Sequence, residues 1–252
     1  MARIASATGR LGTGLTAGRP FRAPHHTISA AGLIGGGTPP RPGEITLAHR
    51  GVLFLDELCE FRRDVLEALR APLEAGEVAI ARVGGRRRLP CRFMLVAASN
   101  PCPCGRGEND PDCTCLGASV QRYQGKLSGA LADRIDLLAA VSQPSAEEIG
   151  GGPGESSAAV RDRVRAARER QEARLGSGRC NAEMTAAEVR ERDLDPAAAA
   201  LLADLYARRR LSGRAHDRAL RLAQTVADLA GSPRIGEEEM AQALQLRRRD
   251  RV

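Results

Sequence analysis

Two short apolar runs, separated by an amphipathic stretch, constrain the fold of this chain most strongly. The runs are VLFLD, residues 52–56, and FMLVAAS, residues 93–99. Continuous apolar runs of this length are typical of parallel strands that are covered on both faces. The stretch between them, residues 61–76, places apolar side chains at the spacing of a helix with one buried face and ends in glycine. The pattern therefore predicts an α/β domain.

The composition limits the kinds of partner that the chain can bind. Aromatic residues make up 2% of the 252 residues, with no Trp, so platforms on which single-stranded bases could stack are nearly absent. The formal net charge of +7 favours polyanionic partners. Almost all of the positive charge is arginine, because Lys126 is the only lysine in the chain.

The sequence also indicates a compartment. It contains no apolar run of 18 residues, so we expect no membrane span, and its first residues lack the apolar segment of a secretory signal. Four of its seven cysteines lie in one short loop. We therefore expect a cytoplasmic protein whose thiols are reduced or bound to a metal.

The composition changes near residue 144. The stretch PSAEEIGGGPGESS is typical of a linker, and the residues after it are rich in Ala, Leu and charged side chains, with repeated helix start and stop signals. We predict an α/β domain over 1–144, a linker over 145–158 and a small helical domain over 159–252.

A pair of acids ends the first apolar run. At the carboxyl edge of a parallel sheet, Asp56 could hold Mg²⁺ and Glu57 could activate a water for attack on a γ-phosphate. The alternative is a solvated acidic turn or a helix cap. Asn100 would lie beside Asp56 if the two strands are neighbours, although it could equally form a turn before proline. Arg134 could reach the phosphate of a neighbouring subunit, or be an ordinary salt-bridged helix residue.

A glycine-centred stretch, EVAIARVGGRRRLP, predicts a β-hairpin over residues 77–90. It carries a cluster of arginines, namely Arg82, Arg86, Arg87 and Arg88. These side chains could contact nucleic-acid phosphates, or form a solvated basic edge that discourages strand pairing.

Four cysteines form two C-x-C pairs in the loop CPCGRGENDPDCTC, namely Cys102, Cys104, Cys113 and Cys115. Four thiolates in one loop could bind Zn²⁺ tetrahedrally and order a segment that has no core. The alternatives are free thiols in a flexible loop or two oxidation-prone pairs. The adjacent His25 and His26 point differently on any regular element, so we expect a structural or DNA-contacting role for them.

Five blocks of sequence in a fixed order, with a sixth near the end, give the chain a specific resemblance to a known family. They are RPFRAPHHTISAAGLIGGG, RPGEITLAHRGVLFLDEL, EALRAPLEAGEVAIAR, LVAASNPCPCG, LSGALADRIDL and LSGRAHDRALRLAQTVADLAG. From about residue 19 to its end, the chain resembles the magnesium-chelatase-like AAA+ ATPases, above all their ComM/YifB competence-related branch. The resemblance implies an incomplete AAA+ parallel-sheet core followed by an all-α lid domain.

The resemblance also implies roles for single residues. It implies a Walker B pair, a sensor 1 residue, an arginine finger and a sensor 2 residue: Asp56 with Glu57, Asn100, Arg134 and Arg214. Arg218 and Arg221, on the same helix as Arg214, are weaker sensor 2 candidates. It further implies ATP and Mg²⁺ as cofactors, hexameric rings, a DNA-gripping pore hairpin, and helicase activity that promotes branch migration in natural transformation.

A phosphate-binding P-loop, G-x-x-x-x-G-K-[ST], does not occur in this sequence. Lys126 is followed by Leu127, and the glycine-rich stretch 9–18 has no lysine. We therefore expect the chain alone to bind ATP weakly and to hydrolyse it negligibly. We also expect that the chain is a truncated or split gene product, and that a partner carries the P-loop. Two other functions stay open: a chelatase-like subunit that drives metal insertion into porphyrin, and a non-catalytic partner of intact subunits.

Overall fold

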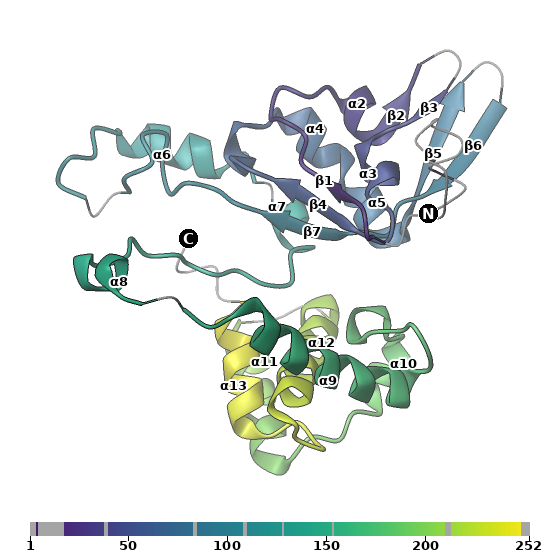
Figure 1. The fold of residues 1–252 in the computed structure, drawn as a ribbon, viewed down its shortest axis with the longest axis vertical. Coiled ribbons are helices and arrows are strands. Elements are labelled where there is room, and N and C mark those ends of the chain that lie inside the picture. Colours follow the sequence, from purple (N-terminus) through teal and green to yellow (C-terminus); the bar gives the residue numbers. More distant parts are fainter. Residues whose placement is uncertain are drawn as a thin grey trace. The chain divides into compact units, whose positions relative to one another are not determined.

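The computed structural model describes residue 4 and residues 18–37, 40–82, 85–107, 110–127, 129–152, 154–209 and 213–247. The chain divides into two compact units, Met1–Ile135 and Asp136–Val252 (Figure 1). The first unit is mixed α/β and the second is helical, which confirms the predicted fold class. The division precedes residue 144, where the sequence pattern ends the first domain.

A small parallel sheet organises the first unit. Its strands are β1 (Phe21–Arg22), β4 (Val52–Leu55) and β7 (Met94–Ala97), in the order β1-β4-β7. β4 is therefore the central strand, and its pairing with β7 runs from Val52 opposite Met94 to Leu55 opposite Ala97. Both predicted strands are confirmed, and their carboxyl ends lie at the same edge of the sheet.

One face of the sheet is packed against short helices. They are α2 (Ala30–Ile34), α3 (Glu44–Leu47), α4 (Arg63–Ala68) and α5 (Arg70–Ala75). The core between them contains Leu53, Leu55 and Phe61, which are fully buried. The predicted single helix over 61–76 is two helices, since Pro72 lacks an N–H and its ring would clash with the carbonyl of Ala68.

The other face of the sheet is apolar and exposed. Phe21, Met94 and Val96 are 63%, 60% and 39% exposed, respectively. The Phe21 ring stacks on that of Phe54, with the ring centroids 6.1 Å apart. The apolar runs predicted strands covered on both faces, and the described residues cover only one of them.

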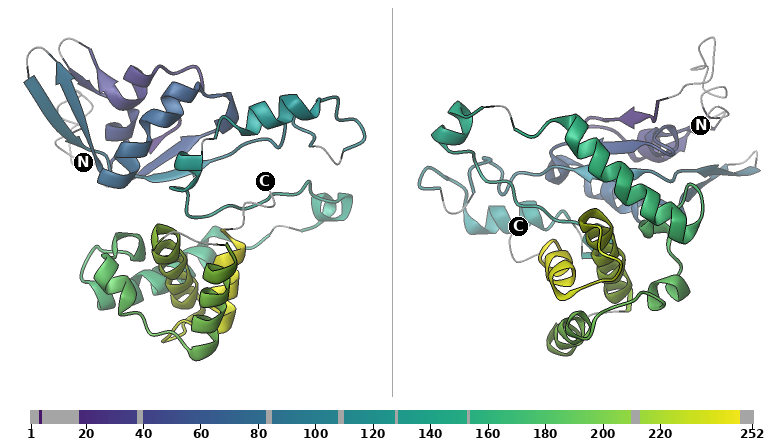
Figure 2. Two further views of the ribbon diagram at one scale, coloured as in Figure 1. Left: turned by 180° about the vertical axis from the view of Figure 1, so that it is seen from behind. Right: turned by 60° about the horizontal axis from the view of Figure 1, so that its bottom comes forward.

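The basic hairpin extends away from the sheet (Figures 1 and 2). Its strands are β5 (Glu77–Arg82) and β6 (Gly85–Pro90), which pair antiparallel with Val78 opposite Leu89 and Ile80 opposite Arg87. The predicted hairpin is thus confirmed, and residues 83 and 84 between the strands lie outside the described part. A smaller hairpin joins β2 (Gly35–Gly36) to β3 (Arg41–Pro42).

Short elements follow the sheet. The turn η1 (Leu58–Glu60) comes after β4, and α6 (Gly117–Gln124) and α7 (Gly129–Ala132) come after β7. In the second unit, α8 (Ala146–Gly150) lies within the range predicted as a linker. It forms there because Ser145 and Glu148 make a reciprocal capping box that satisfies the first backbone N–H groups.

The second unit is a helical bundle. Its remaining elements are α9 (Ser157–Leu175), η2 (Asn181–Glu183), α10 (Ala186–Arg190), α11 (Pro196–Arg209), α12 (Gly213–Ala230) and α13 (Glu237–Gln245). Its core is built from small and aliphatic side chains, among them Ala223, Ala227, Ile235 and Met240, all fully buried. Helix α12 packs against both α9 and α13.

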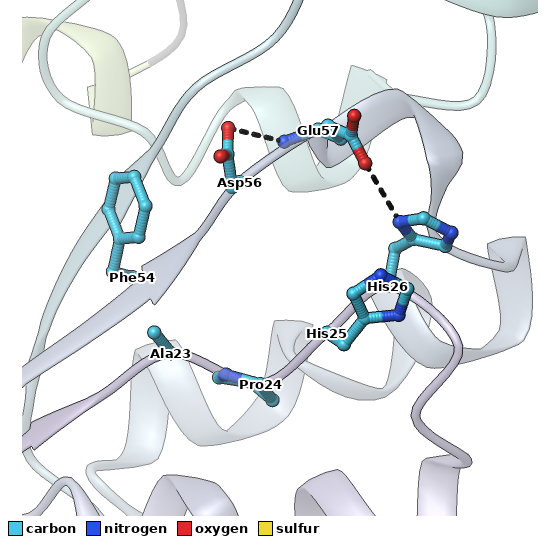
Figure 3. Close-up of a pocket in the computed structure, with 7 residues that line it drawn as sticks. All are labelled: Ala23, Pro24, His25, His26, Phe54, Asp56 and Glu57. Atoms are coloured by element: carbon cyan, nitrogen blue, oxygen red, sulfur yellow. Dashed lines mark hydrogen bonds and ion pairs between the residues drawn. The ribbon is translucent and has the colours of Figure 1, made fainter.

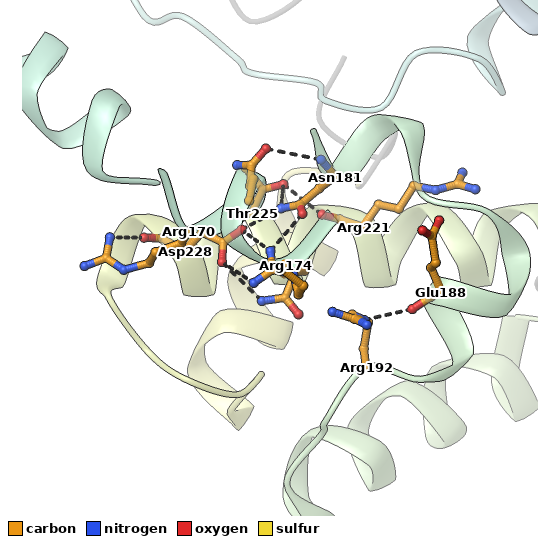
Figure 4. A network of polar contacts seen from close by, with 10 residues as sticks. Arg170, Arg174, Asn181, Glu188, Arg192, Arg221, Thr225 and Asp228 are labelled. Carbon is orange, nitrogen blue, oxygen red and sulfur yellow. Dashed lines mark hydrogen bonds and ion pairs between the residues drawn. The ribbon is translucent and has the colours of Figure 1, made fainter. Parts of the chain in front are cut away.

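A buried carboxylate ties α12 to α9 and η2 (Figure 4). The Asp228 side chain is 1% exposed and accepts two hydrogen bonds from Arg174, at 3.0 Å and 2.7 Å. Asn181 donates a third, at 2.7 Å. A separate ion pair between Arg179 and Glu188 lowers the pKa of Glu188 to about 2.

We expect Asp228→Ala to destabilise the helical unit by about 3–5 kcal/mol, because the part-buried Arg174 guanidinium loses its counter-charge and the buried Asn181 amide loses its acceptor. Hydrogen exchange of the α12 amides over a series of urea concentrations measures the change in the free energy of unfolding. The matched control is Glu155→Ala, which removes an exposed ion pair with Arg163 and is expected to cost under about 1 kcal/mol. Equal losses in the two variants would contradict the prediction.

Candidate functional site

Two acidic residues stand at the carboxyl end of the central strand. Asp56 and Glu57 follow β4 directly, and both are exposed. Asp56 Oδ1 accepts a hydrogen bond from the backbone N–H of Glu57, with a donor–acceptor distance of 2.9 Å (Figure 3). Open α/β sheets bind ligands at this edge, so the central position of β4 places both carboxylates where neighbouring strands can add further groups.

The backbone of Glu57 is strained. It has φ 51° and ψ 48°, in the left-handed region, which costs a residue with a Cβ about 1–2 kcal/mol. The turn is held by the N–H of Leu58, which donates to the carbonyl of Ala98 at 2.8 Å. Strained non-glycine residues of this kind cluster at functional sites, which motivates the hypothesis of a functional role for Glu57.

His26 contacts the second acid. Its Nδ1 lies 2.9 Å from Glu57 Oε2, and its ring is 4.0 Å, centroid to centroid, from that of His25. Neither histidine was predicted from the sequence to meet Glu57. The contact depends on the parallel pairing of β1 with β4, which brings the segment after β1 to the same edge as Glu57 and which no local sequence pattern indicates.

These groups line an open pocket of about 350 Å³ (Figure 3). Its lining residues are Ala23, Pro24, His25, His26, Phe54, Asp56 and Glu57. The end of β4 contributes Phe54 and the two carboxylates to one side, and the segment after β1 contributes Ala23, Pro24 and the two imidazoles to the other. Carboxylate oxygens are the protein ligands that Mg²⁺ prefers, so the donor set fits that ion.

Asn100 reaches the same edge of the sheet. It lies three residues beyond the last residue of β7, Ala97, which pairs with Leu55 of β4. The condition set for its role, that the two strands are neighbours, is therefore met. The turn after it passes near this side chain, since a Cβ added to Gly105 would be in ordinary van der Waals contact, at 3.8 Å, with the amide nitrogen of Asn100.

Arg134 is held inside its own unit. Its side chain is 12% exposed, and Nη2 lies 2.7 Å from Glu74 Oε1 of α5. This ion pair is what the alternative interpretation, an ordinary salt-bridged arginine, expects. Its role as an arginine finger stays a prediction.

The three lid arginines of α12 differ in their surroundings within the second unit. Arg214 is exposed at the start of the helix. Arg218 Nη1 lies 3.6 Å from Asp136 Oδ1, and Arg221 donates to the carbonyl of Met184 at 2.8 Å. Arg221 therefore supports the local fold.

The basic hairpin has an exposed second arm. Arg87 and Arg88 are exposed, and Arg88 Nη1 lies 3.1 Å from Glu77 Oε1. The side chains of Arg82 and Arg86 lie outside the described part of the structure. The single lysine is far from this arm in the sequence, and Lys126 Nζ lies 3.8 Å from Glu60 Oε2.

The four loop cysteines converge. The Sγ atoms of Cys102, Cys104, Cys113 and Cys115 all lie within 4.8 Å of one another, and none forms a disulfide. Cys102 is fully buried, and the backbone N–H of Gly107 donates to its Sγ at 3.2 Å. This hydrogen bond, together with hydrogen bonds from Cys104 and Cys113, lowers the pKa of the Cys102 thiol to about 6.

Two family models match the chain. The model described as magnesium chelatase, subunit ChlI, matches residues 1–149, and the one described as magnesium chelatase, subunit ChlI C-terminal, matches residues 154–247. The chain belongs to the magnesium chelatase ChlI-like family of AAA+ ATPases. Within it, the chain is a ComM/YifB homologue, as the following relatives show.

An uncharacterized protein of Mycobacterium tuberculosis is 47% identical over 90% of the chain. Competence protein ComM of Haemophilus influenzae is 45% identical over 91%, and the uncharacterized protein YifB of Escherichia coli is 42% identical over 93%. The chain spans about half the length of these relatives, 45% of ComM and 46% of the other two. No helix in the described part of the chain is long and apolar enough to cross a membrane.

We expect Glu57→Gly to be about 1 kcal/mol more stable than Glu57→Ala, since both remove the carboxylate and only glycine adopts the left-handed backbone without strain. Urea unfolding of the two variants, followed by circular dichroism, measures the difference. An alanine variant at least as stable as the glycine variant would show that the backbone at Glu57 is not strained.

Proposed function

We propose that this chain supplies the Walker B, sensor 1 and lid portion of a ComM/YifB-type AAA+ ATPase that couples ATP hydrolysis to DNA remodelling. The observation that carries the proposal is the acid pair at the end of the central strand, with Asn100 at the end of the neighbouring strand. Membership of the family supports ATP and Mg²⁺ as the ligands of this edge.

The two acids would have different roles. Asp56 would hold Mg²⁺, which neutralises charge on the phosphates when it is bound. Glu57 would act as the general base that takes a proton from the attacking water. Asn100 would hold that water or a phosphate oxygen through its side-chain amide.

His26 would orient the base. Its Nδ1 holds Glu57 Oε2 at 2.9 Å, so Oε1 is the oxygen left to accept the proton. The left-handed backbone at Glu57 turns this carboxylate toward His26 and away from Asp56, which separates the base from the metal ligand. Arg134 and Arg214 would supply positive charge to the transition state, as the family resemblance implies.

A second polypeptide segment is part of the proposal. The exposed apolar face of the sheet, formed by Phe21, Phe54, Met94 and Val96, is the kind of surface that a covering layer buries. The curated relatives are about twice as long as this chain. We propose that an α/β segment carrying the P-loop covers this face and completes the nucleotide site.

Mixing the chain with the P-loop-bearing portion of a relative tests the proposal through ATP turnover. We expect the mixture to turn over ATP at least tenfold faster than either part alone, and Glu57→Gln to remove that gain while nucleotide binding persists. Glu60→Gln is the matched control, because Glu60 is an exposed carboxylate three residues further along that should leave the gain intact. No gain in the mixture would contradict the proposal.

DNA is the proposed polyanionic substrate. The hairpin extends from the body of its unit and presents the exposed Arg87 and Arg88, and the net charge of the chain is +7. Arginine side chains on a projecting hairpin can contact DNA phosphates. Such contacts contribute affinity but do not distinguish one base sequence from another.

We expect Arg86→Ala/Arg87→Ala to flatten the dependence of duplex DNA affinity on salt, by about 0.9 in log–log slope for each phosphate that the hairpin no longer neutralises. Fluorescence anisotropy across a salt titration of the reconstituted mixture measures the slope. The matched control, Arg161→Ala/Arg165→Ala, removes the same charge from the exposed surface of α9 and should leave the slope unchanged. Equal slopes for hairpin variant and parent would remove the hairpin from the interface.

The family description itself favours a second candidate, a chelatase-like subunit whose ATPase drives Mg²⁺ insertion into porphyrin. DNA-stimulated turnover in the mixture separates the two, because the chelatase function predicts no stimulation. A third candidate is a non-catalytic partner that donates Arg134 in trans, for which Glu57→Gln would leave turnover intact.

A further inference from the structure

We propose that Cys102, Cys104, Cys113 and Cys115 bind one structural zinc ion that fixes the position of Asn100. The separations of the sulfur atoms carry the proposal. Cys102 Sγ lies 3.3 Å from Cys104 Sγ and 3.8 Å from Cys113 Sγ, and the Cys104 and Cys113 sulfurs are 3.7 Å apart. A tetrahedron with zinc–sulfur bonds of about 2.3 Å has edges of about 3.8 Å.

The loop backbone is shaped for this convergence. Gly105 and Gly107 have φ 85° and 95°, a region that suits glycine and lets the chain reverse direction between the two cysteine pairs. The N–H of Gly107 points at the Cys102 sulfur, and the N–H of Gly105 donates to the Cys102 carbonyl at 3.0 Å. Hydrogen bonds from backbone N–H groups stabilise the negative charge of a thiolate ligand.

The loop has little apolar side-chain material with which to order itself. Apart from Cys102, its side chains are largely exposed, and Leu116 at its end is 78% exposed. Arg106 pairs with Asp112 at 2.8 Å on the surface, an interaction that contributes little to stability. A metal ion bound by four sulfurs would supply the folding free energy that the loop lacks.

The donor set selects the metal. Among the described residues the cluster consists of four cysteines, and four thiolates in one set are typical of structural zinc, with iron as the competing metal. A closed set of four protein ligands leaves no position for water or substrate. The proposed ion is therefore structural, and the nucleotide chemistry does not pass through it.

The four-cysteine loop is connected to the edge of the sheet through its first turn, which follows Asn100. Gly105 packs beside the amide of Asn100, and the Gln124 side chain of α6 donates to the carbonyl of Pro101 at 3.0 Å. Ordering Cys102 and Cys104 around an ion would therefore fix the turn behind Asn100 and dock α6 next to it. In this arrangement, which rests on the proposed function, Asn100 would contact the water or a phosphate oxygen, and the cysteines would position it.

The test is metal analysis of the full chain purified without chelators. We expect about one zinc per chain, and loss of that zinc in Cys113→Ser/Cys115→Ser. Cys180→Ser is the matched control, because Cys180 is a half-exposed thiol in the helical unit and should leave the zinc content unchanged. Replacement by Co²⁺ should give the visible absorption bands of a tetrahedral tetrathiolate site.

Hydrogen exchange of the unmutated chain tests the positioning role even if the double variant fails to fold. Chelation should raise amide exchange at residues 98–107 and in α6, re-addition of Zn²⁺ should reverse it, and α12 should not change. Substoichiometric metal with no tetrathiolate Co²⁺ spectrum would overturn the site, and bound iron would overturn its assignment to zinc. Unchanged exchange would overturn the positioning of Asn100. None of these measurements uses ATP, so their failure is distinct from failure of the proposed ATPase.

Discussion

The parallel pairing of β4 between β1 and β7 is the constraint on which the candidate site depends. Each strand contributes its carboxyl end to one edge, so the segment after β1 brings His26, β4 brings the acid pair, and the stretch after β7 brings Asn100. His26 and Asn100, more than 70 positions apart in the sequence, thereby lie at the same edge of the sheet. The core face of the sheet fixes the register, because a slip of one residue would expose Leu53 and Leu55.

Strain and charge are arranged around that edge. Glu57 keeps a left-handed backbone because the hydrogen bond from Leu58 to Ala98 and the contact with His26 hold both sides of the turn. The helical unit uses charge differently. There a buried carboxylate, Asp228, joins α9, η2 and α12 through arginine and asparagine, next to a core of aliphatic side chains and methionines.

The described part of the chain lacks apolar packing in two places, the four-cysteine loop between Cys102 and Cys115 and the exposed face of the sheet. In the loop, four converging sulfurs could bind a metal ion, which would order the loop as a hydrophobic core does elsewhere. On the sheet, Phe21, Met94 and Val96 form a surface that a further segment would bury. Both features lie next to the proposed nucleotide edge: the loop follows β7, and the exposed face is formed by β1, β4 and β7.

The sequence by itself determined the local elements and the chemistry they carry: two apolar strands, a hairpin between them, an acid pair, a four-cysteine loop and a helical second half. Periodicity and turn residues encode these features locally. Pro72 divides one predicted helix, and a capping box of Ser145 and Glu148 forms a helix in the predicted linker; both signals are local and are present in the sequence. Only the tertiary structure decided that His26 meets Glu57, that Arg134 meets Glu74 and that four sulfurs converge, because those contacts depend on strand order and chain reversal rather than on neighbouring residues.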